Sequence, residues 1–390
     1  MKALFQKYFK GDPVIWTVMI ILSVYSLLAV FSSTGTLAYK YQGGDTSHYL
    51  FKHSAIMLAG LFITYLTHYV PYLFYAKISR ILYFVSIPLL ILTLALGTNL
   101  NEASRWLTLP GGVTFQTSDF AKLALIMFLA RILSKNQGDL KNWKTAFRPS
   151  IIATCIICLL IFPANFSTAA IIFVIAIVMM FIGRINIRHL LAVAGIGVVL
   201  GGIFIGIILY KCDLFPRGFT WKNRLYSFVG KAEEQGDSNF QAEQSKIAVS
   251  SGGLLGKGPG NSSQRNFLPH PYSDFIFAII VEEYGLVFGA LPIIGLYLFL
   301  IYRAGVIIRK TQSSFAALLA VGLTFSLVFQ AFINMAVAVN LFPVTGQTLP
   351  LVSMGGTSIF FTSVALGILL SISRSIKESE NESNTEPATA

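Results

Sequence analysis

Residues 14–33 read VIWTVMIILSVYSLLAVFSS, a segment without a single charged side chain. A helix needs about 20 mostly apolar residues to cross the hydrocarbon core of a bilayer, so this segment is long enough to do so. Mostly apolar stretches recur along the chain, and together they predict ten membrane-spanning helices. These lie near residues 14–33, 53–70, 78–97, 119–134, 150–162, 167–183, 189–210, 274–302, 315–340 and 351–374.

The composition of the 390 residues agrees with a chain whose main solvent is lipid. Apolar residues make up 55% and charged residues only 12%, whereas about 25% of residues are charged in ordinary soluble domains. The mean hydropathy is +0.69. This excludes a secreted enzyme, a cytosolic dehydrogenase or a nucleic-acid-binding domain as the main body. We therefore expect an all-α polytopic membrane protein.

Basic residues indicate the orientation of the spans. When the N-terminus is placed in the cytoplasm, the segments on that side carry most of the Lys and Arg. The short loops on the other side then hold only Lys40, Lys52 and Arg105. Cytoplasmic loops are enriched in Lys and Arg, so both termini are predicted to be cytoplasmic. The net charge of +12 indicates contact with the anionic head groups of the lipid bilayer.

One long loop and one polar tail interrupt this pattern. Residues 211–273 are predicted to form a large extracytoplasmic loop, and loops of this length usually carry function or are disordered. This one retains apolar segments and a glycine-rich run, so we expect it to be ordered. Residues 375–390 are polar and lack aromatic side chains, which predicts a disordered cytoplasmic tail. Residues 1–374 are then a single ten-helix membrane domain.

A first group of candidate functional residues lies around the fourth predicted span. Asp119 and Lys122 are three residues apart, so they share one face of a helix. A lysine within a membrane span is costly unless it is paired. The pair either locks two helices together or, with Arg105 and the outward-facing N-terminal end of the helix, receives a phosphate.

A second group lies in the long loop. Glu234 and Asp237 belong to an acidic cluster, and a carboxylate at the membrane surface can act as a general base, although acidic residues in an exposed loop are usually only solvated. The glycines within residues 252–260 let backbone amides approach an anion closely. A P-loop would end in Gly-Lys-Ser/Thr, whereas residues 256–258 read GKG, so nucleotide binding is not expected.

Two further features concern the interior of the bundle. Glu282 and Glu283 lie one to two turns into the span near residues 274–302, so at least one of them is expected to face the bundle interior. Prolines and glycines within residues 343–356 break the regularity of the chain near the outer surface. Non-helical backbone at membrane depth is tolerated only where protein or a watery cavity covers it. This segment is therefore either a cavity wall or a plain turn before the last helix.

Three long motifs resemble those of the SEDS family (shape, elongation, division and sporulation), the polytopic peptidoglycan glycosyltransferases. They are SRWLTLPGGVTFQTSDFAKLALIMFLAR at 104–131, GGLLGKGPGNSSQRNFLPHPYSDFIFAIIVEEYG at 252–285 and NLFPVTGQTLPLVSMGGTSI at 340–359. Their order and the ten-span layout agree over nearly the whole chain. The Gly-Asn-Ser within the second motif resembles the division-type members of the family more than the elongation-type members.

The resemblance implies polymerisation of lipid II, an undecaprenyl-pyrophosphate-linked disaccharide peptide. In that reaction the 4-hydroxyl of an acceptor GlcNAc attacks C1 of MurNAc with inversion, and undecaprenyl pyrophosphate leaves. The sequence requires no cofactor. Arg and Lys alone could bind the pyrophosphate, and a divalent cation is the alternative. The alternatives are a lipid II flippase or transporter, a non-catalytic scaffold for a transpeptidase, and an elongation-type polymerase acting in cell shape.

The resemblance also implies partners and a location. A class B penicillin-binding protein transpeptidase and other divisome proteins are the expected partners, and no nucleic acid is expected. The expected location is the bacterial cytoplasmic (inner) membrane, at the septum of dividing cells.

The family's essential outer-loop aspartate has two candidates in this chain. Counting from Phe228 without a gap places Glu234 at its position, whereas a small gap selects Asp237, which we favour as the base. The family's Asp-Pro and Gly-x-Gly are missing here, and Asp119 stands where the family has Glu. Substrate contacts are expected from Arg105, Gln116, Asp119, Lys122, Lys246, Lys257, Asn261, Ser262, Gln264, His270 and Asp274.

Overall fold

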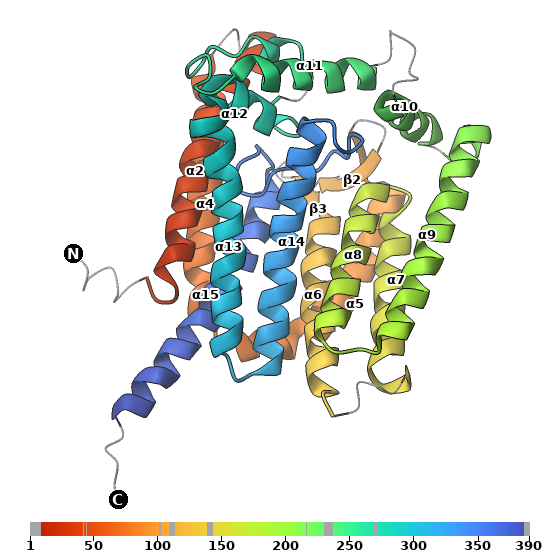
Figure 1. Cartoon of the computed structure of the whole chain (residues 1–390), viewed down its shortest axis with the longest axis vertical. Helices are drawn as coiled ribbons and strands as arrows, with labels where there is room; N and C mark the ends of the chain where they lie inside the picture. The colour runs from red at the N-terminus through yellow and green to blue at the C-terminus, as the bar shows by residue number, and fades with distance from the viewer. Residues whose placement is uncertain are drawn as a thin grey trace, which may run out of the picture.

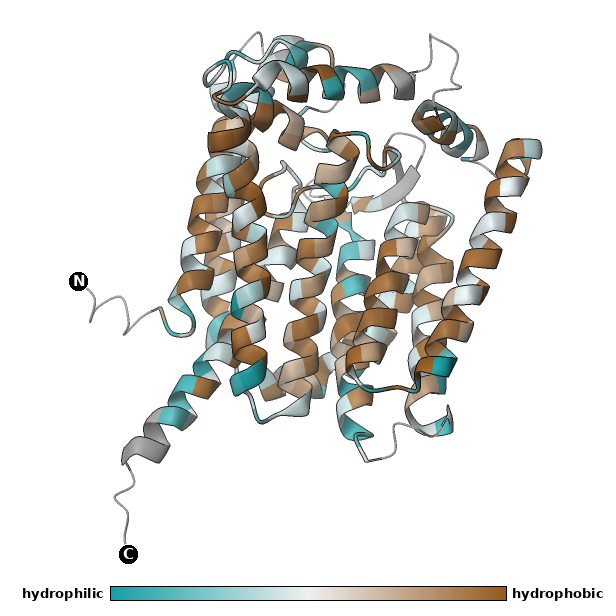
Figure 2. Ribbon diagram, viewed as in Figure 1, coloured by the Kyte–Doolittle hydropathy of each residue, from teal (hydrophilic) through white to brown (hydrophobic). Residues whose placement is uncertain are grey.

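The chain folds into a bundle of long helices, with two shorter helices lying across one end (Figure 1). The computed structural model describes residues 9–41, 43, 45–100, 103–108, 114–138, 143–215, 217–229, 237–268 and 271–385. Within these residues, eight helices are long and apolar enough to cross a membrane. Apolar residues run along the length of the bundle, and hydrophilic ones gather towards its ends (Figure 2). This confirms the predicted fold class of a helical polytopic membrane protein.

The long helices follow the predicted spans closely. They are α2 (Pro13–Ser33), α4 (Ser47–Tyr69), α5 (Tyr72–Leu96), α6 (Thr117–Lys135), α7 (Arg148–Ile161), α8 (Phe166–Ile182), α9 (Ile187–Tyr210), α12 (Ile276–Gly285), α13 (Leu291–Lys310), α14 (Ser314–Ala338) and α15 (Thr357–Thr385). Short π-helical segments, Trp143–Phe147 and Leu286–Ala290, extend α7 and join α12 to α13 into one span. The eight spans do not include α8, which is apolar but shorter, or α6, which carries four charged residues. With these two helices the structure agrees with the ten-span layout.

Local signals in the sequence start several of these helices. Pro13 occupies the first turn of α2, and the Asp12 carboxylate accepts a hydrogen bond from the Val14 amide at 2.8 Å. The Asn165 side chain caps α8 in the same way, accepting from the Thr168 amide at 3.3 Å. Such side chains satisfy amides that have no partner inside the helix, so the ends of these apolar helices are fixed by polar residues.

A small antiparallel sheet, which the sequence did not predict, lies between α5 and α6. Its strands are β1 (Thr98–Leu100), β2 (Ala103–Thr108) and β3 (Thr114–Gln116), in the order β1-β2-β3. Trp106 pairs with Gln116 across β2 and β3, so the sheet positions the residue that precedes α6. The class is therefore helical with this one short addition.

The long loop contains two helices, α10 (Gly218–Val229) and α11 (Asp237–Gly252), which cross the end of the bundle (Figure 1). We call this end the loop end. The Ser245 hydroxyl donates to the Ala338 carbonyl at 2.7 Å and fastens α11 to the end of α14. Three short helices, α3 (Gly35–Tyr41), η2 (Cys212–Leu214) and η3 (Gln264–Asn266), complete the secondary structure described. The expectation of an ordered loop holds for its described residues.

The last span starts later than predicted. Residues 351–356 are not helical, and α15 begins at Thr357. Leu351 and Gly356 have positive φ angles of 63° and 50°, which a right-handed helix does not allow. These turns return the chain to the bundle before the helix begins.

The tail differs from the prediction at the other end of α15. Residues 375–390 were expected to be disordered, but the helix continues to Thr385, and residues 386–390 lie outside the described part. Arg374 and Glu378 form an ion pair at 3.7 Å with i,i+4 spacing, which supports a helix at its surface. The prediction of disorder rested on the polar composition of this segment, which does not reveal the i,i+4 spacing of Arg374 and Glu378.

The first and last spans meet at the end of the bundle opposite the loop end. The Lys377 ammonium donates to the Gly11 carbonyl at 2.6 Å, and Lys10 lies 3.5 Å from the Glu378 carboxylate. The start of α2 and the end of α15 therefore lie on the same side, as an even number of spans requires.

Candidate active site

A largely buried lysine of α6 forms the centre of the candidate site. The Lys122 ammonium lies 3.4 Å from the Asp119 carboxylate and donates to the side-chain oxygen of Gln330, on α14, at 2.7 Å. Only 13% of the Lys122 side chain and 6% of the Asp119 side chain are exposed. The predicted pairing on one helix face is confirmed, and the same cation also ties α6 to α14.

A small pocket adjoins this pair between α6, α14 and α15. One oxygen of Asp119, Oδ2, has no hydrogen-bond partner among the described residues. The pocket has apolar walls with hydroxyl groups, and it is lined by Asp119, Lys122, Leu123, Ile126, Leu323, Ser326, Leu327, Ser358, Phe361, Thr362 and Ala365. A charged group in such surroundings attracts an opposite charge more strongly than it would in water.

An extended segment is connected to the pair through Gln330, whose side chain donates to the Thr348 carbonyl at 3.0 Å. Residues 343–349 have no regular secondary structure, yet polar side chains bind them firmly. The Asn334 amide of α14 donates to the Gln347 carbonyl at 2.7 Å and to the Asp274 carbonyl at 2.9 Å. The Gln347 side chain donates to the Thr168 hydroxyl of α8 at 2.8 Å. Non-helical backbone is thus covered by protein at this depth. We call residues 343–349 the wall, which Gln330 connects to Lys122.

The strand before α6 places a further predicted residue near this wall. The Gln116 backbone amide donates to the Thr357 hydroxyl at 3.2 Å, and its side chain donates to the Ser118 hydroxyl at 3.2 Å. Gln116 therefore connects the start of α6 with the start of α15. Arg105 belongs to strand β2, but its side chain lies outside what the structure describes.

Helix α10 brings a basic residue of the long loop to the same end of the bundle. Burial lowers the pKa of Arg224, and the negative charge of Asp274 opposes that change. The two side chains therefore interact electrostatically, although they are far apart in sequence. The Asp274 carboxylate also accepts a hydrogen bond from the Ser273 hydroxyl at 2.9 Å. Asp274 precedes α12 and does not open it, because the N-cap of that helix is Phe275.

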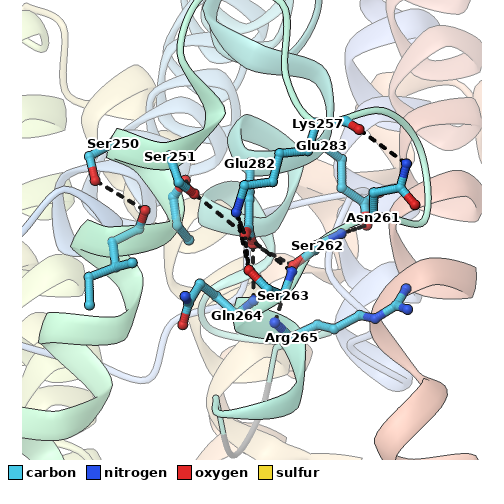
Figure 3. Close-up of polar contacts among 12 residues, drawn as sticks. Ser250, Ser251, Lys257, Asn261, Ser262, Ser263, Gln264, Arg265, Glu282 and Glu283 are labelled. Carbon is cyan, nitrogen blue, oxygen red and sulfur yellow. Dashed lines mark hydrogen bonds and ion pairs between the residues drawn. The ribbon is translucent and has the colours of Figure 1, made fainter.

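The glycine-rich motif folds around a buried carboxylate of α12, Glu282 (Figure 3). Lys257 lies 2.6 Å from it, the Ser263 hydroxyl donates at 2.9 Å, and the amides of Ser263 and Gln264 donate at 3.2 and 3.3 Å. Ser262 adds a short hydrogen bond from its hydroxyl. We call these four residues and Glu282 the Glu282 cradle.

Close backbone packing explains the glycines of this motif. Gly256 has a φ of +84°, and a Cβ built on it would lie 2.2 Å from the Glu283 carbonyl oxygen. The amides of Lys257 and Gly258 donate to the Glu282 and Glu283 carbonyls, each at 2.9 Å. The backbone of this motif therefore lies directly against the backbone of Glu282 and Glu283. This is the physical reason for the glycines in the structure.

Glu283 links the cradle to the first span. Its carboxylate accepts from the Ser32 hydroxyl of α2 and from the Ser262 amide. Arg265 donates to the carbonyl and to the hydroxyl of Ser32 at 3.1 and 3.0 Å. Glu282 and Glu283 are both buried, and Glu283 contacts the first span, which agrees with the expectation that at least one of them faces inward.

Comparison with known proteins places this architecture in a family. Residues 12–378 match the family of FtsW, RodA and SpoVE, described as "Cell cycle protein". The chain belongs to this FtsW/RodA/SpoVE family. It is 32% identical over 376 residues to the "Probable peptidoglycan glycosyltransferase FtsW" of Bacillus subtilis (strain 168), covering 95% of this chain and 92% of the relative. The protein of the same name from Haemophilus influenzae is 32% identical over 370 residues, covering 93% and 90%.

Solved structures of the FtsW/RodA/SpoVE family share the fold. Thermus thermophilus RodA matches with a TM-score of 0.68 at 23% identity, covering 94% of this chain and 98% of that chain. A chain from "a peptidoglycan synthase complex" matches with a TM-score of 0.70 at 24% identity, covering 94% and 98%. The helical arrangement described above is therefore the fold of this family.

No contact among the described residues joins the other predicted site residues of this FtsW/RodA/SpoVE protein to Lys122. Lys246 and Asn261 are exposed, and the Asn261 side chain donates to the Lys257 carbonyl at 3.1 Å. Asp237 is the first residue of α11, but its side chain is not described. Glu234 and His270 lie outside the described residues. The roles of Asp237 and Glu234 as base, and of the loop residues as substrate contacts, stay predictions.

Gln330 and Gln347 were not predicted as site residues, yet Gln330 connects Lys122 to the wall and Gln347 connects the wall to α8. Lys122 was recognised because a charge inside an apolar span is unusual, whereas Gln330 and Gln347 are uncharged amides. In the sequence they differ from their surroundings only as polar side chains in or beside an apolar span. In the described part of the chain, no group of three or more His, Cys, Asp or Glu residues comes together to hold a metal ion.

Proposed function

We propose that this protein is a peptidoglycan glycosyltransferase that polymerises lipid II into β-1,4 glycan strands during septal cell-wall synthesis. The observation that carries the proposal is the Lys122 ammonium, held by Asp119 and Gln330 inside an apolar bundle beneath the long loop. A fixed cation at this depth suits a substrate that has a lipid tail and a pyrophosphate. The relatives named above carry the same activity in their names.

The proposed reaction is a displacement at an anomeric carbon. The acceptor GlcNAc 4-hydroxyl attacks C1 of the donor MurNAc and a carbon–oxygen bond forms with inversion. The bond from C1 to the pyrophosphate oxygen breaks, and undecaprenyl pyrophosphate leaves with the electron pair. The hydroxyl proton passes to a carboxylate of the long loop, Asp237 or Glu234. Lys122 and Arg105 stabilise the charge that develops on the leaving group.

The proposed setting is a complex in the bacterial inner membrane. A class B penicillin-binding protein transpeptidase would cross-link the strands as they form, and one of the structurally similar chains comes from a peptidoglycan synthase complex. The loops on the same side of the membrane as the N-terminus carry an excess of Lys and Arg, which supports a cytoplasmic location for both termini. The identity to FtsW proteins favours a role in division over a role in cell elongation.

Polymerisation and transport of lipid II are separated by one assay. The full chain, purified with its transpeptidase partner, is given fluorescent lipid II, and products are resolved by gel electrophoresis. We expect glycan strands that lysozyme degrades. The protein would be a transporter if the complex with an active transpeptidase made no strands and the protein moved lipid II across the membrane of liposomes. If the protein neither makes strands nor transports lipid II, the remaining alternative is a non-catalytic scaffold for the transpeptidase.

A further inference from the structure

Gln330 makes the shorter of the two polar contacts of Lys122. The Lys122 ammonium lies 2.7 Å from the Gln330 side-chain oxygen and 3.4 Å from the Asp119 carboxylate. Gln330 is only 4% exposed, so water does not replace this contact readily. The direction of the ammonium is therefore set by α14 as much as by its own helix.

The other end of the Gln330 amide holds the extended wall. Its nitrogen donates to the Thr348 carbonyl at 3.0 Å. One helical turn later, Asn334 donates to the neighbouring Gln347 carbonyl at 2.7 Å. Residues four apart on a helix lie on one face, so α14 binds two successive carbonyls of the wall with two amides.

An amide is suited to this position because it accepts with its oxygen and donates with its nitrogen. An ammonium only donates and a carbonyl only accepts, so one orientation of Gln330 satisfies both partners at once. A carboxylate would bind Lys122 but would have no proton for Thr348. It would also neutralise the ammonium and compete with an incoming anion for it.

We propose that Gln330 is a positioning residue that aims the Lys122 ammonium and couples it to the wall formed by residues 343–349. This inference rests on the proposed function, in which Lys122 receives the pyrophosphate of a lipid-linked sugar. Gln330 acts through Lys122 and adds no second negative charge beside the Asp119 carboxylate. The neutral amide thereby orients the cation without competing with the substrate.

Two substitutions separate the parts of this role. Gln330→Glu keeps an acceptor for Lys122 but adds a competing charge and loses the donor to Thr348. We expect the KM for lipid II to rise about tenfold or more, with kcat changed less than about threefold, because binding of the anion is weakened before reaction. Gln330→Met removes both contacts, and we expect kcat/KM to fall about tenfold to 100-fold, because a misplaced group loses much of its effect.

Two measurements on substrate-free protein test the coupling independently of catalysis. The rate at which acetic anhydride modifies Lys122 is followed by mass spectrometry, and hydrogen exchange is followed over residues 343–349. We expect both to rise about threefold or more in Gln330→Met. The control is Gln137→Met, which replaces an exposed glutamine in the turn after the far end of α6 and should change neither.

The outcomes distinguish this inference from the proposed function. If wild type makes no glycan but Lys122 modification and wall exchange both change in the Gln330 variants, the coupling stands and the enzymatic role falls. If wild type polymerises lipid II and both variants keep wild-type kinetics, Gln330 is not a positioning residue. If Gln330→Met does not fold, Gln330→Glu decides: an unchanged KM overturns the inference and a raised KM supports it.

Discussion

Replacing Lys122 with methionine is expected to lower the rate of lipid II polymerisation by about 100-fold or more. The reason is that a fixed charge aimed at a leaving group, in a site that excludes most water, is worth far more than the same charge in solution. The substitution also leaves Asp119 buried without its cation, and breaking a buried ion pair costs about 3–5 kcal/mol. The melting temperature of the purified protein should therefore fall as well.

A double substitution separates the two effects. In Lys122→Met combined with Asp119→Asn no unpaired charge remains, so the melting temperature should return most of the way to wild type. The polymerisation rate should stay as low as in the single variant. Lys135→Met serves as the control, because Lys135 is exposed at the opposite end of the same helix and should retain full activity. A double variant with a rate within about threefold of wild type would show that the pair only locks the helices.

Replacing Glu282 with alanine is expected to destabilise the loop end of the protein. The Glu282 carboxylate accepts from Lys257, Ser262, Ser263 and Gln264 within the cradle. Its removal leaves several donors without an acceptor, and we expect a loss of about 3 kcal/mol. Lys257 is one-third exposed, so its ammonium can turn to water and the loss is smaller than for a fully buried pair.

The effect should be localised and measurable by hydrogen exchange. Residues 253–264 should lose protection in Glu282→Ala, and the apparent melting temperature should fall. Glu282→Gln keeps an acceptor and should be intermediate. Glu243→Ala removes an exposed carboxylate from α11 in the same loop and should leave exchange unchanged. Wild-type protection of residues 253–264 in Glu282→Ala would contradict the cradle.

Much of the fold was predictable because lipid imposes simple requirements on the sequence. Spans must be apolar and long enough, and a charge inside them must be paired. These two rules locate the helices, the Asp119–Lys122 pair and the inward-facing Glu282 and Glu283. They do not locate the start of α15, because residues 351–356 adopt turns, with positive φ angles at Leu351 and Gly356, that apolar length does not reveal.

The partners of these residues were not predictable in the same way. Gln330 contacts Lys122 across 208 positions of sequence, and nothing in either segment specifies which faces meet. The glycine-rich run was read as a surface for an external anion, because the sequence does not reveal that Glu282 folds back into it. A polar residue in an apolar span indicates that it has a partner, but only the packed structure identifies that partner.

The central claim is that a carboxylate of the long loop and Lys122 act on one lipid-linked pyrophosphate. The most direct measurement is lipid II polymerisation by Asp237→Asn, by Glu234→Gln and by the double variant, each purified with the transpeptidase partner. Removal of a general base lowers a rate by about 100-fold to 10,000-fold, so we predict that Asp237→Asn and the double variant make no detectable strands. Wild-type strand formation by the double variant would contradict the account.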